Sequence, residues 1–229
     1  MKNNHKKLIA SIALVGTMAA GGTFALLQTT TNTAVNNFTS NQKISGALFE
    51  DSFKGNGVTN TEKDKFKDDD DATVEHIKGG TWNEYLPTQE QAKDPKIKIY
   101  KGNVESRVAM KLTCYLDNDG NGTIEDTEKV SYDVLKNNLA TIKTNGADGF
   151  NTTNWEQDEK DPSVFYYIGT LKPTATEGAT TEALFDSVRI NDNVTAPKAF
   201  KIEAKGYAVQ AVGTDENQSY KTALKELMK

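Results

Sequence analysis

A twelve-residue stretch, residues 117–128 with the sequence DNDGNGTIEDTE, carries oxygen-bearing side chains at the spacing of a calcium-binding EF-hand loop. Calcium is a hard cation that takes six to eight oxygen ligands at about 2.3–2.6 Å, and such a loop supplies them from positions 1, 3, 5, 7, 9 and 12. At position 7 the ligand is a backbone carbonyl, and at position 9 it often acts through water. The sequence predicts one Ca²⁺ ion with these ligand residues: Asp117, Asp119, Asn121, Thr123, Glu125 and Glu128.

The residues between and around these ligands indicate what the ion would do. Gly122 occupies position 6, where the chain turns sharply, and Ile124 at position 8 can pin the loop to the body of the protein. A strand pattern at 108–116 leads into the loop and a helix pattern at 130–143 follows it, unlike a true EF-hand. The sequence has no second such loop, and sensor EF-hands respond by moving helices apart. We therefore predict a structural calcium site at a strand-to-helix crossover; the alternative is an acidic surface loop that never holds metal.

The remaining residues offer little catalytic chemistry. A catalytic zinc site needs about three protein ligands, commonly histidines, and an open position, whereas this chain has two histidines, His5 and His76, and no His-Glu-x-x-His. A serine or cysteine triad is not indicated, because His76 would have to be its base and nothing near it in the sequence suggests a site. Cys114, the single cysteine, cannot form an internal disulfide and is expected to be a small buried side chain. We do not expect an enzyme.

Residues 1–25 have the features of a secretory signal peptide. Lys2, Lys6 and Lys7 precede an apolar run too short to span a bilayer, and small residues up to Ala25 suggest cleavage before Leu26. The alternative is a membrane anchor that is never removed. Cleavage would remove three lysines and no acidic residue, changing the net charge from −5 to −8. We expect a secreted protein with no membrane segment after cleavage, and its acidity argues against a nucleic-acid partner.

Hydrophobic alternation predicts a mainly β fold, an antiparallel β-sandwich over residues 44–229, preceded by an extended Thr/Asn-rich arm at 26–43. Alternation is clearest at 108–116, and a shorter alternation at 97–99 followed by a turn at Gly102 suggests that these two segments pair. Further strands are expected at 44–48, 163–171, 183–190 and 199–212.

Three local features interrupt the strand pattern. Helical spacing of apolar residues predicts one inserted short helix at 130–143 and a short C-terminal helix at 219–229. Within the last strand the apolar residues change face at Gly206, which predicts a β-bulge or bend there. The charged segment 62–76 is expected to be a solvated loop or a frayed helix. The aromatic residues expected to pack in the core or in turns are Trp82, Trp155, Phe165, Tyr166 and Tyr167.

Five segments share their sequence pattern with one protein family. They are the leader ending GGTFA, NNFTSNQKISGAL at 36–48, KDPKIKIYKGNVESRVAMKL at 93–112, YYIGTLKPTATEGATTEALFDSVRI at 166–190 and FKIEAKGYAVQA at 200–211. Together they resemble the camelysin/TasA family, exported proteins of Gram-positive bacteria that a SipW-type signal peptidase processes. The resemblance implies an extracellular sandwich of jelly-roll type. In the TasA branch it also implies fibre assembly in the biofilm matrix, the N-terminal arm of one subunit completing the sheet of the next.

These observations support three functional hypotheses. The first is a secreted structural protein of the cell surface or biofilm matrix, which self-assembles through the arm and is stabilised by one calcium ion. The second is a monomeric calcium-stabilised adhesin or binding module, whose arm is a disordered remnant of the leader. The third is a secreted metallopeptidase, which the camelysin name implies and which the shortage of zinc ligands opposes.

Overall fold

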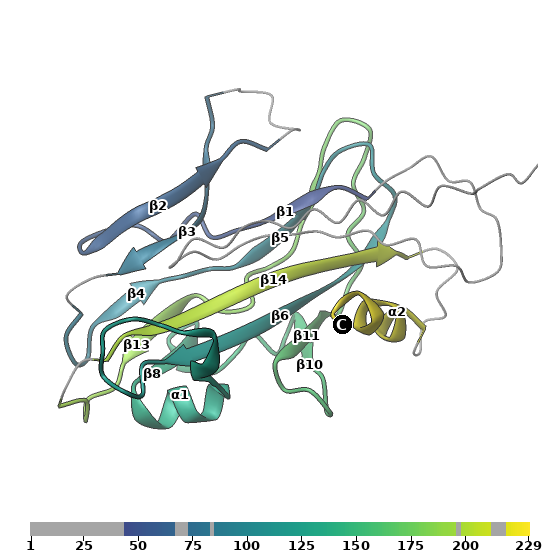
Figure 1. The fold of residues 1–229 in the computed structure, drawn as a ribbon. Coiled ribbons are helices and arrows are strands. Elements are labelled where there is room, and N and C mark those ends of the chain that lie inside the picture. The colour runs from purple at the N-terminus through teal and green to yellow at the C-terminus, as the bar shows by residue number, and fades with distance from the viewer. Residues whose placement is uncertain (1–43, 67–72, 83–84, 196–197, 212–218) are drawn as a thin grey trace, which may run out of the picture.

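The computed structural model describes residues 44–66, 73–82, 85–195, 198–211 and 219–229. The predictions about the leader at 1–25 and the arm at 26–43 therefore lie outside the described residues. The described part is mainly β, as predicted: its strands pair antiparallel in several sheets, and it contains two α-helices (Figure 1). The sandwich and its jelly-roll connectivity stay predictions. No helix in the described segments is long and apolar enough to cross a membrane.

The longest strand pair joins β6 (Ser106–Leu116) to β14 (Phe200–Gln210), each of 11 residues, in unbroken register. On its other side β6 pairs with β11 (Val164–Tyr167), and β10 (Trp155–Gln157) continues this sheet beyond β11. A short strand, β7 (Lys129–Val130), pairs with the end of β6. Strands therefore form within the predicted segments 108–116, 163–171 and 199–212.

The other described strands form three smaller sheets. They are β1 (Gly46–Phe49), β5 (Lys96–Ile99) and β12 (Ala179–Thr180); then β4 (Glu90–Ala92), β13 (Ser187–Ile190), β8 (Ala140–Thr144) and β9 (Ala147–Asp148); and finally β2 (Val58–Asp64) with β3 (His76–Trp82). The predicted pairing of 97–99 with 108–116 is wrong, because β5 pairs with β1 and β12. Ile97 and Ile99 are buried in the same core as β6, so the two alternating segments belong to packed sheets and not to one hairpin.

Gly206 of β14 packs closely against β5 and β1, and the predicted bulge there is wrong. β14 keeps its register with β6 through Gly206, which lies opposite Met110. A Cβ at this position would stand 3.2 Å from Ile97 Cγ1 and 3.7 Å from Leu48 Cδ1. The glycine is therefore needed for the close approach of β5 and β1, and the backbone does not bend.

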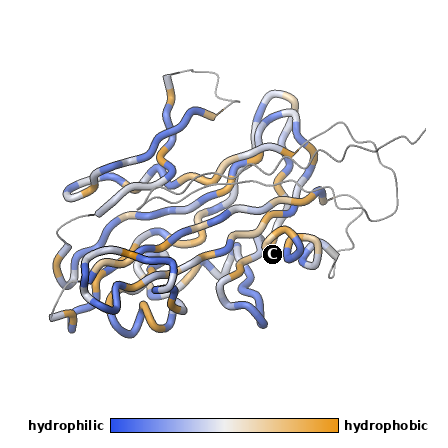
Figure 2. The backbone as a smooth tube through the Cα atoms, viewed as in Figure 1, coloured by the Kyte–Doolittle hydropathy of each residue, from blue (hydrophilic) through white to orange (hydrophobic). Residues whose placement is uncertain are grey.

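The change of apolar face along β14 has a different cause, which is the C-terminal helix. Helix α2 (Ser219–Leu227) confirms the helix predicted at 219–229, and its Tyr220 and Leu224 pack with Tyr207 of β14 and Tyr166 of β11 in a second hydrophobic cluster. The main core lies on the other face of β14, where Ile202, Ala204 and Ala208 are buried. In Figure 2 hydrophobic stretches accordingly lie along the strands and along α2.

The helix predicted at 130–143 is half right. Helix α1 (Tyr132–Asn138) begins after Ser131, whose Oγ accepts a hydrogen bond from the Val134 N–H at 3.3 Å. The chain then leaves the helical conformation at Leu139, and Ala140–Thr144 form strand β8, which pairs with β13. The asparagines that end α1 are poor helix formers, and the β-branched residues Thr141, Ile142 and Thr144 favour a strand.

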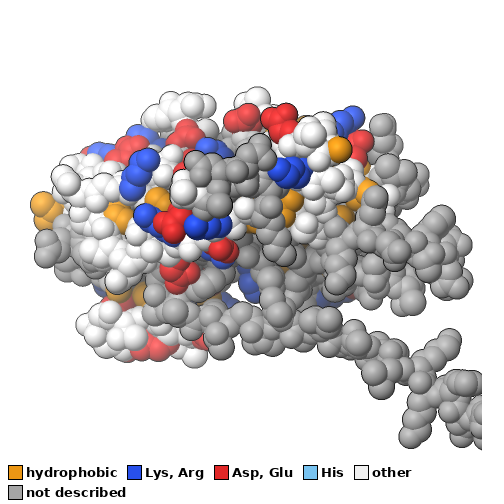
Figure 3. Space-filling view, turned by 90° about the horizontal axis from the view of Figure 1, so that it is seen from above, with side chains coloured by type: hydrophobic (Ala, Val, Ile, Leu, Met, Phe, Trp, Pro, Cys, Tyr) orange, Lys and Arg blue, Asp and Glu red, His pale blue; other side chains and the backbone are white. Residues whose placement is uncertain are grey.

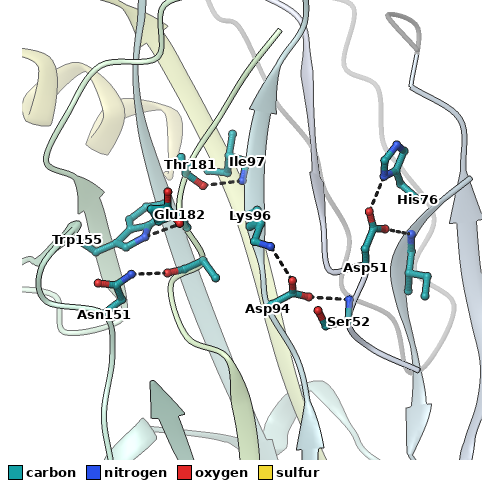
Figure 4. Close-up of polar contacts among 12 residues, drawn as sticks. Asp51, Ser52, His76, Asp94, Lys96, Ile97, Asn151, Trp155, Thr181 and Glu182 are labelled. Carbon is teal, nitrogen blue, oxygen red and sulfur yellow. Dashed lines mark hydrogen bonds and ion pairs between the residues drawn. The ribbon is translucent and has the colours of Figure 1, made fainter. Parts of the chain in front are cut away.

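The charged segment 62–76 is a loop only in part where it is described, since residues 65–66 and 73–75 lie outside the strands and helices and the others do not. Residues 62–64 belong to β2 and His76 begins β3, and this antiparallel strand pair lies away from both helices in Figure 1. Asp51 holds this strand pair: its Oδ2 lies 2.7 Å from His76 Nδ1, a contact drawn in Figure 4. The Ile77 N–H donates to Asp51 Oδ1. The His76 ring also stacks on Phe66 at 3.7 Å between centroids.

The described surface is polar and of mixed charge. Figure 3 shows acidic and basic side chains interspersed over the described part of one face, with hydrophobic side chains in small separate spots. The large hydrophobic residues that are exposed lie far apart in the sequence: Val74, Leu86, Val134 and Ile168. Single exposed apolar residues of this kind are normal on a protein surface.

Candidate metal-binding loop

The loop predicted to bind calcium joins two paired strands. It begins at Asp117, directly after β6, where the Asp117 N–H donates to the Ala199 carbonyl at 2.9 Å. It ends in a short 3₁₀ turn, η1 (Asp126–Glu128), followed at once by β7, which pairs back onto β6 with Val130 opposite Cys114. The predicted strand-to-helix crossover is therefore wrong: the loop closes a β-hairpin, and α1 starts only after β7.

Asp117 organises the first half of the loop. Its carboxylate is almost fully buried, with 2% of the residue exposed. The Gly120 N–H donates to Oδ1 at 2.7 Å and the Gly122 N–H to Oδ2 at 2.9 Å. Both glycines have positive φ, +74° and +82°, a conformation that favours glycine. The predicted sharp turn at Gly122 is confirmed, and Gly120 provides a second one.

Glu128 closes the loop by joining its two ends. The Asn118 N–H donates to Glu128 Oε1 at 2.7 Å, and the Glu125 N–H donates to Oε2 at 3.1 Å. The residue is buried, so these bonds are sheltered from water. Two buried carboxylates thus hold four backbone N–H groups, and the loop has a defined shape before any ion is considered.

The middle of the loop is exposed and centred on Asn121. Its Nδ2 donates to Asp119 Oδ2 at 2.9 Å and to Glu125 Oε1 at 3.1 Å, while its Oδ1 accepts from the Thr123 N–H at 2.7 Å. The Asn121 N–H also donates to Asp119 Oδ1 at 3.0 Å. The amide group therefore supplies donor hydrogens between two carboxylates that would otherwise repel each other.

The structure brings three of the six predicted ligands together. Carboxylate oxygens of Asp117, Asp119 and Glu128 lie within 4.8 Å of one another, close enough to hold one metal ion. Glu125 is linked to this triad through the Asn121 amide, and Thr123 through its N–H to Asn121. The acidic triad is a possible metal site whose donors are all carboxylate oxygens.

Hydrogen bonding sets the pKa values of these carboxylates. Burial raises the pKa of Asp117, but the N–H groups of Gly122 and Gly120 outweigh it and the net pKa lies below its ordinary value. The N–H groups of Asn118 and Glu125 lower the pKa of Glu128. The Asn121 amide lowers the pKa of Glu125, yet the neighbouring Glu128 and Asp119 carboxylates and partial burial bring its net value above the usual range. Of these three carboxylates, Glu125 is therefore the one that protonates first as the pH falls.

Ile124, which was predicted to pin the loop to the body of the protein, is half-buried and faces a cavity, so the pinning contact stays a prediction. With the backbone at Gly122 and Thr123 it forms one wall of a cavity of about 360 Å³ next to β3 and β14. Sequence reasoning missed this cavity and the buried ion pair beside it, in which Lys93 Nζ lies 2.5 Å from Glu50 Oε2. Glu50 follows the apolar run of β1 and is itself fully buried. An acidic residue directly after an apolar strand was the sequence signal that could have indicated a buried ion pair.

The other residues singled out in the sequence lie in the hydrophobic core or pack against it. Cys114 is buried, as predicted, and burial raises the pKa of its thiol to about 12. Trp155, Phe165 and Tyr166 are buried, which confirms the core prediction, while Trp82 and Tyr167 pack partly buried against the core. Figure 4 shows Trp155 donating from Nε1 to the Glu182 carbonyl at 3.1 Å, beside the bond from Asn151.

Comparisons with known proteins do not assign this chain. No family model, no curated protein and no solved structure matches it. The likeness to the camelysin/TasA family therefore stays a prediction based on the five quoted segments. The chemistry of the loop, the strands around it and those sequence patterns are the guides to function.

Proposed function

We propose that this protein is an exported, non-catalytic structural protein of the cell surface or biofilm matrix, and that its loop 117–128 holds one calcium ion. The observation that carries the metal proposal is the meeting of Asp117, Asp119 and Glu128 oxygens within 4.8 Å at the end of the longest strand pair. Export and the matrix role are supported by the lysine-led apolar leader and by the resemblance to camelysin/TasA proteins.

The donor set fits calcium better than a transition metal. Carboxylate oxygens suit hard cations, whereas zinc and copper sites use imidazole or thiolate. Ligands on opposite sides of a calcium ion are about 4.6–5.2 Å apart, twice the Ca–O distance, so oxygens within 4.8 Å can contact one ion. Asn121 now places amide hydrogens between Asp119 and Glu125. A bound cation would neutralise the same carboxylates more strongly.

In a hairpin the ion would act as a brace. Both ends of the loop are already fixed by the pairing of β7 with β6 and by the Glu128 hydrogen bonds. Calcium would therefore stiffen an existing shape and would not separate two helices as in a sensor. We expect a dissociation constant of about 10⁻⁴–10⁻³ M, as in extracellular modules, or a tighter one because the loop is preformed. At calcium tenfold above that constant, binding adds about 1.4 kcal/mol of stability.

Self-assembly is proposed through the arm at 26–43, which lies outside the described residues. Its uncharged Thr/Asn composition suits an added strand, because backbone groups alone can pair with a sheet edge. Among the described strands, β14 ends its sheet and is 11 residues long, a length that offers many backbone groups. These two features support strand donation between copies.

Thermal melting in calcium and in EDTA tests the metal proposal. Wild-type protein should melt at a higher temperature in calcium, and Asp119→Asn and Glu128→Gln should remove that difference. Glu128→Gln also disturbs two backbone bonds, so the calcium-dependent difference is read and not the absolute melting temperature. Glu159→Gln, an exposed acid outside the loop, is the control and should keep the shift. Identical wild-type curves in EDTA and millimolar calcium would refute the calcium site.

Size-exclusion chromatography and negative-stain microscopy test the assembly proposal. Protein beginning at residue 26 should form fibres, and protein beginning at residue 44 should not. A monomer in every condition would instead support the calcium-stabilised adhesin. Cleavage of casein that chelators abolish would overturn the non-catalytic assignment.

A further inference from the structure

The cavity beside the metal loop is partly open and is lined by elements that lie far apart in the sequence. Its volume is about 360 Å³, at the lower end of the range of small-molecule sites. The loop forms one wall, residues 80–82 of β3 another, and Val188 of β13 with residues 199–202 a third. Phe53 and Lys93 complete the lining. Its larger apolar side chains are Phe53, Trp82, Ile124, Val188, Phe200 and Ile202.

Aromatic contacts fix the shape of one side. The Tyr85 ring lies between Trp82 and Phe200, with centroid distances of 5.6 Å to each. The Tyr85 hydroxyl in turn donates to the Lys198 carbonyl. Phe200 and Trp82 thus hold their places against the core without a ligand. A preformed aromatic wall favours a flat ligand, because little conformational entropy is lost on binding.

The charged residues that line the cavity are neutralised within the protein. Lys93 forms the buried pair with Glu50. Lys201 lies 3.0 Å from Glu203 and its Nζ stands 4.1 Å from the centre of the Tyr115 ring. No other charged residue of the described segments lines this cavity. A charged ligand would leave water and find no excess of opposite charge, which is unfavourable in an apolar site.

We propose that this cavity binds one small, uncharged, mainly aromatic molecule. The apolar side chains supply its contact area, the aromatic wall selects a flat shape, and the internal pairing of both lysines excludes charge. The cavity is a site separate from the metal triad, although Ile124 and its neighbours form one wall. Binding there does not depend on which ion the loop holds.

Two fluorescent probes with the same ring system test the charge selectivity. N-phenyl-1-naphthylamine is uncharged, and 8-anilino-1-naphthalenesulfonate carries one sulfonate on the same skeleton. Titration of full-length protein should show the uncharged probe binding at micromolar concentration, at least tenfold more tightly than the sulfonate. Equal affinity for the two probes, or tighter binding of the sulfonate, would overturn the proposal, as would no binding of the uncharged probe.

A blocking variant tests the location. Thr81 is half-buried at the β3 wall, so Thr81→Phe should fill the cavity and weaken the uncharged probe more than tenfold. Thr176→Phe, at an exposed threonine elsewhere, is the matched control and should leave binding unchanged. If Thr81→Phe is not folded by circular dichroism, Thr81→Leu replaces it. Unchanged binding in a folded blocking variant would place the probe elsewhere and refute the site.

Each titration is run both in calcium and in EDTA, so that the two proposals can fail separately. Probe binding without a calcium-dependent melting shift would support the cavity and refute the metal site. A melting shift without selective probe binding would do the reverse.

Discussion

Replacing Gly206 with alanine should destabilise the protein, although alanine normally stabilises a strand. The added Cβ would lie 3.2 Å from Ile97 Cγ1 and 3.3 Å from its Cδ1, and Ile97 is fully buried. Relief of the glycine backbone entropy favours alanine by about 0.5–1 kcal/mol. Overpacking costs about 1–3 kcal/mol. The difference of these ranges spans about 0–2.5 kcal/mol. For a rigidly held neighbour the steric cost dominates, so we expect a net loss of about 1–2 kcal/mol.

Thermal melting by circular dichroism measures this effect. For a domain of this size a loss of about 1–2 kcal/mol corresponds to a melting temperature lower by about 2–8 °C. Ile97→Val removes Cδ1, so the double variant Gly206→Ala/Ile97→Val should be more stable than the sum of the single effects by at least about 0.5 kcal/mol. Lys205→Ala, on the opposite face of β14, is the control. A Gly206→Ala protein that melts at or above the wild-type temperature would show that position 206 turns away from the core, as a bulge would require.

Three further outcomes are expected. Burial raises the pKa of Asp158, but the Lys225 ammonium and nearby N–H groups bring it from 3.8 down to about 2. A depressed folded pKa gives stability that is complete above pH about 4 and lost as the pH falls toward 2, so acid titration of stability should be shallower over this window in Asp158→Asn. The Cys114 thiol, with its pKa raised to about 12, should react with 5,5′-dithiobis(2-nitrobenzoate) at pH 8 only after denaturant is added. Glu50→Gln or Lys93→Met alone should lower the free energy of unfolding, measured in urea, by about 3–5 kcal/mol. The double variant Glu50→Leu/Lys93→Met should recover most of that stability. Equal losses of stability in the single and double variants would contradict the buried pair.

Local periodicity correctly predicted those strands and helices whose conformation agrees with their own hydrophobic pattern. The alternation from Val108 to Leu116 became β6, and the apolar stripe of Tyr220 and Leu224 became α2. The spacing of the loop acids likewise anticipated the meeting of Asp117 with Glu128. In each of these cases the information lies within about a dozen residues of sequence.

Features set by distant partners were not predictable in this way. β5 alternates as a hairpin strand would, yet its partners β1 and β12 are far from it in sequence. Helical spacing continues through Ile142, but pairing with β13 makes that residue part of a strand. The pairing of β2 with β3 was not predicted, because β2 is mostly exposed and rich in charged residues and so lacks an apolar alternation. Asp51, which accepts a hydrogen bond from β3, lies outside both strands.

The same limit applies to the candidate site. Spacing identified the acids, but it did not show that the N–H groups of Asn118 and Gly120 bind their carboxylates. Nor did it show that β7 would return to pair with β6. Backbone donors carry no side-chain signature, so the preformed shape of the loop becomes visible only once the fold is known.

The long β6–β14 ladder also has a mechanical consequence. Its hydrogen bonds run perpendicular to the strands, and eleven Cα pairs keep one register without interruption. Tension pulling the two strands past each other would load all those bonds in shear at the same moment, so that none could yield alone. A protein built around such a pair should resist stretching along that axis far better than peeling from one end.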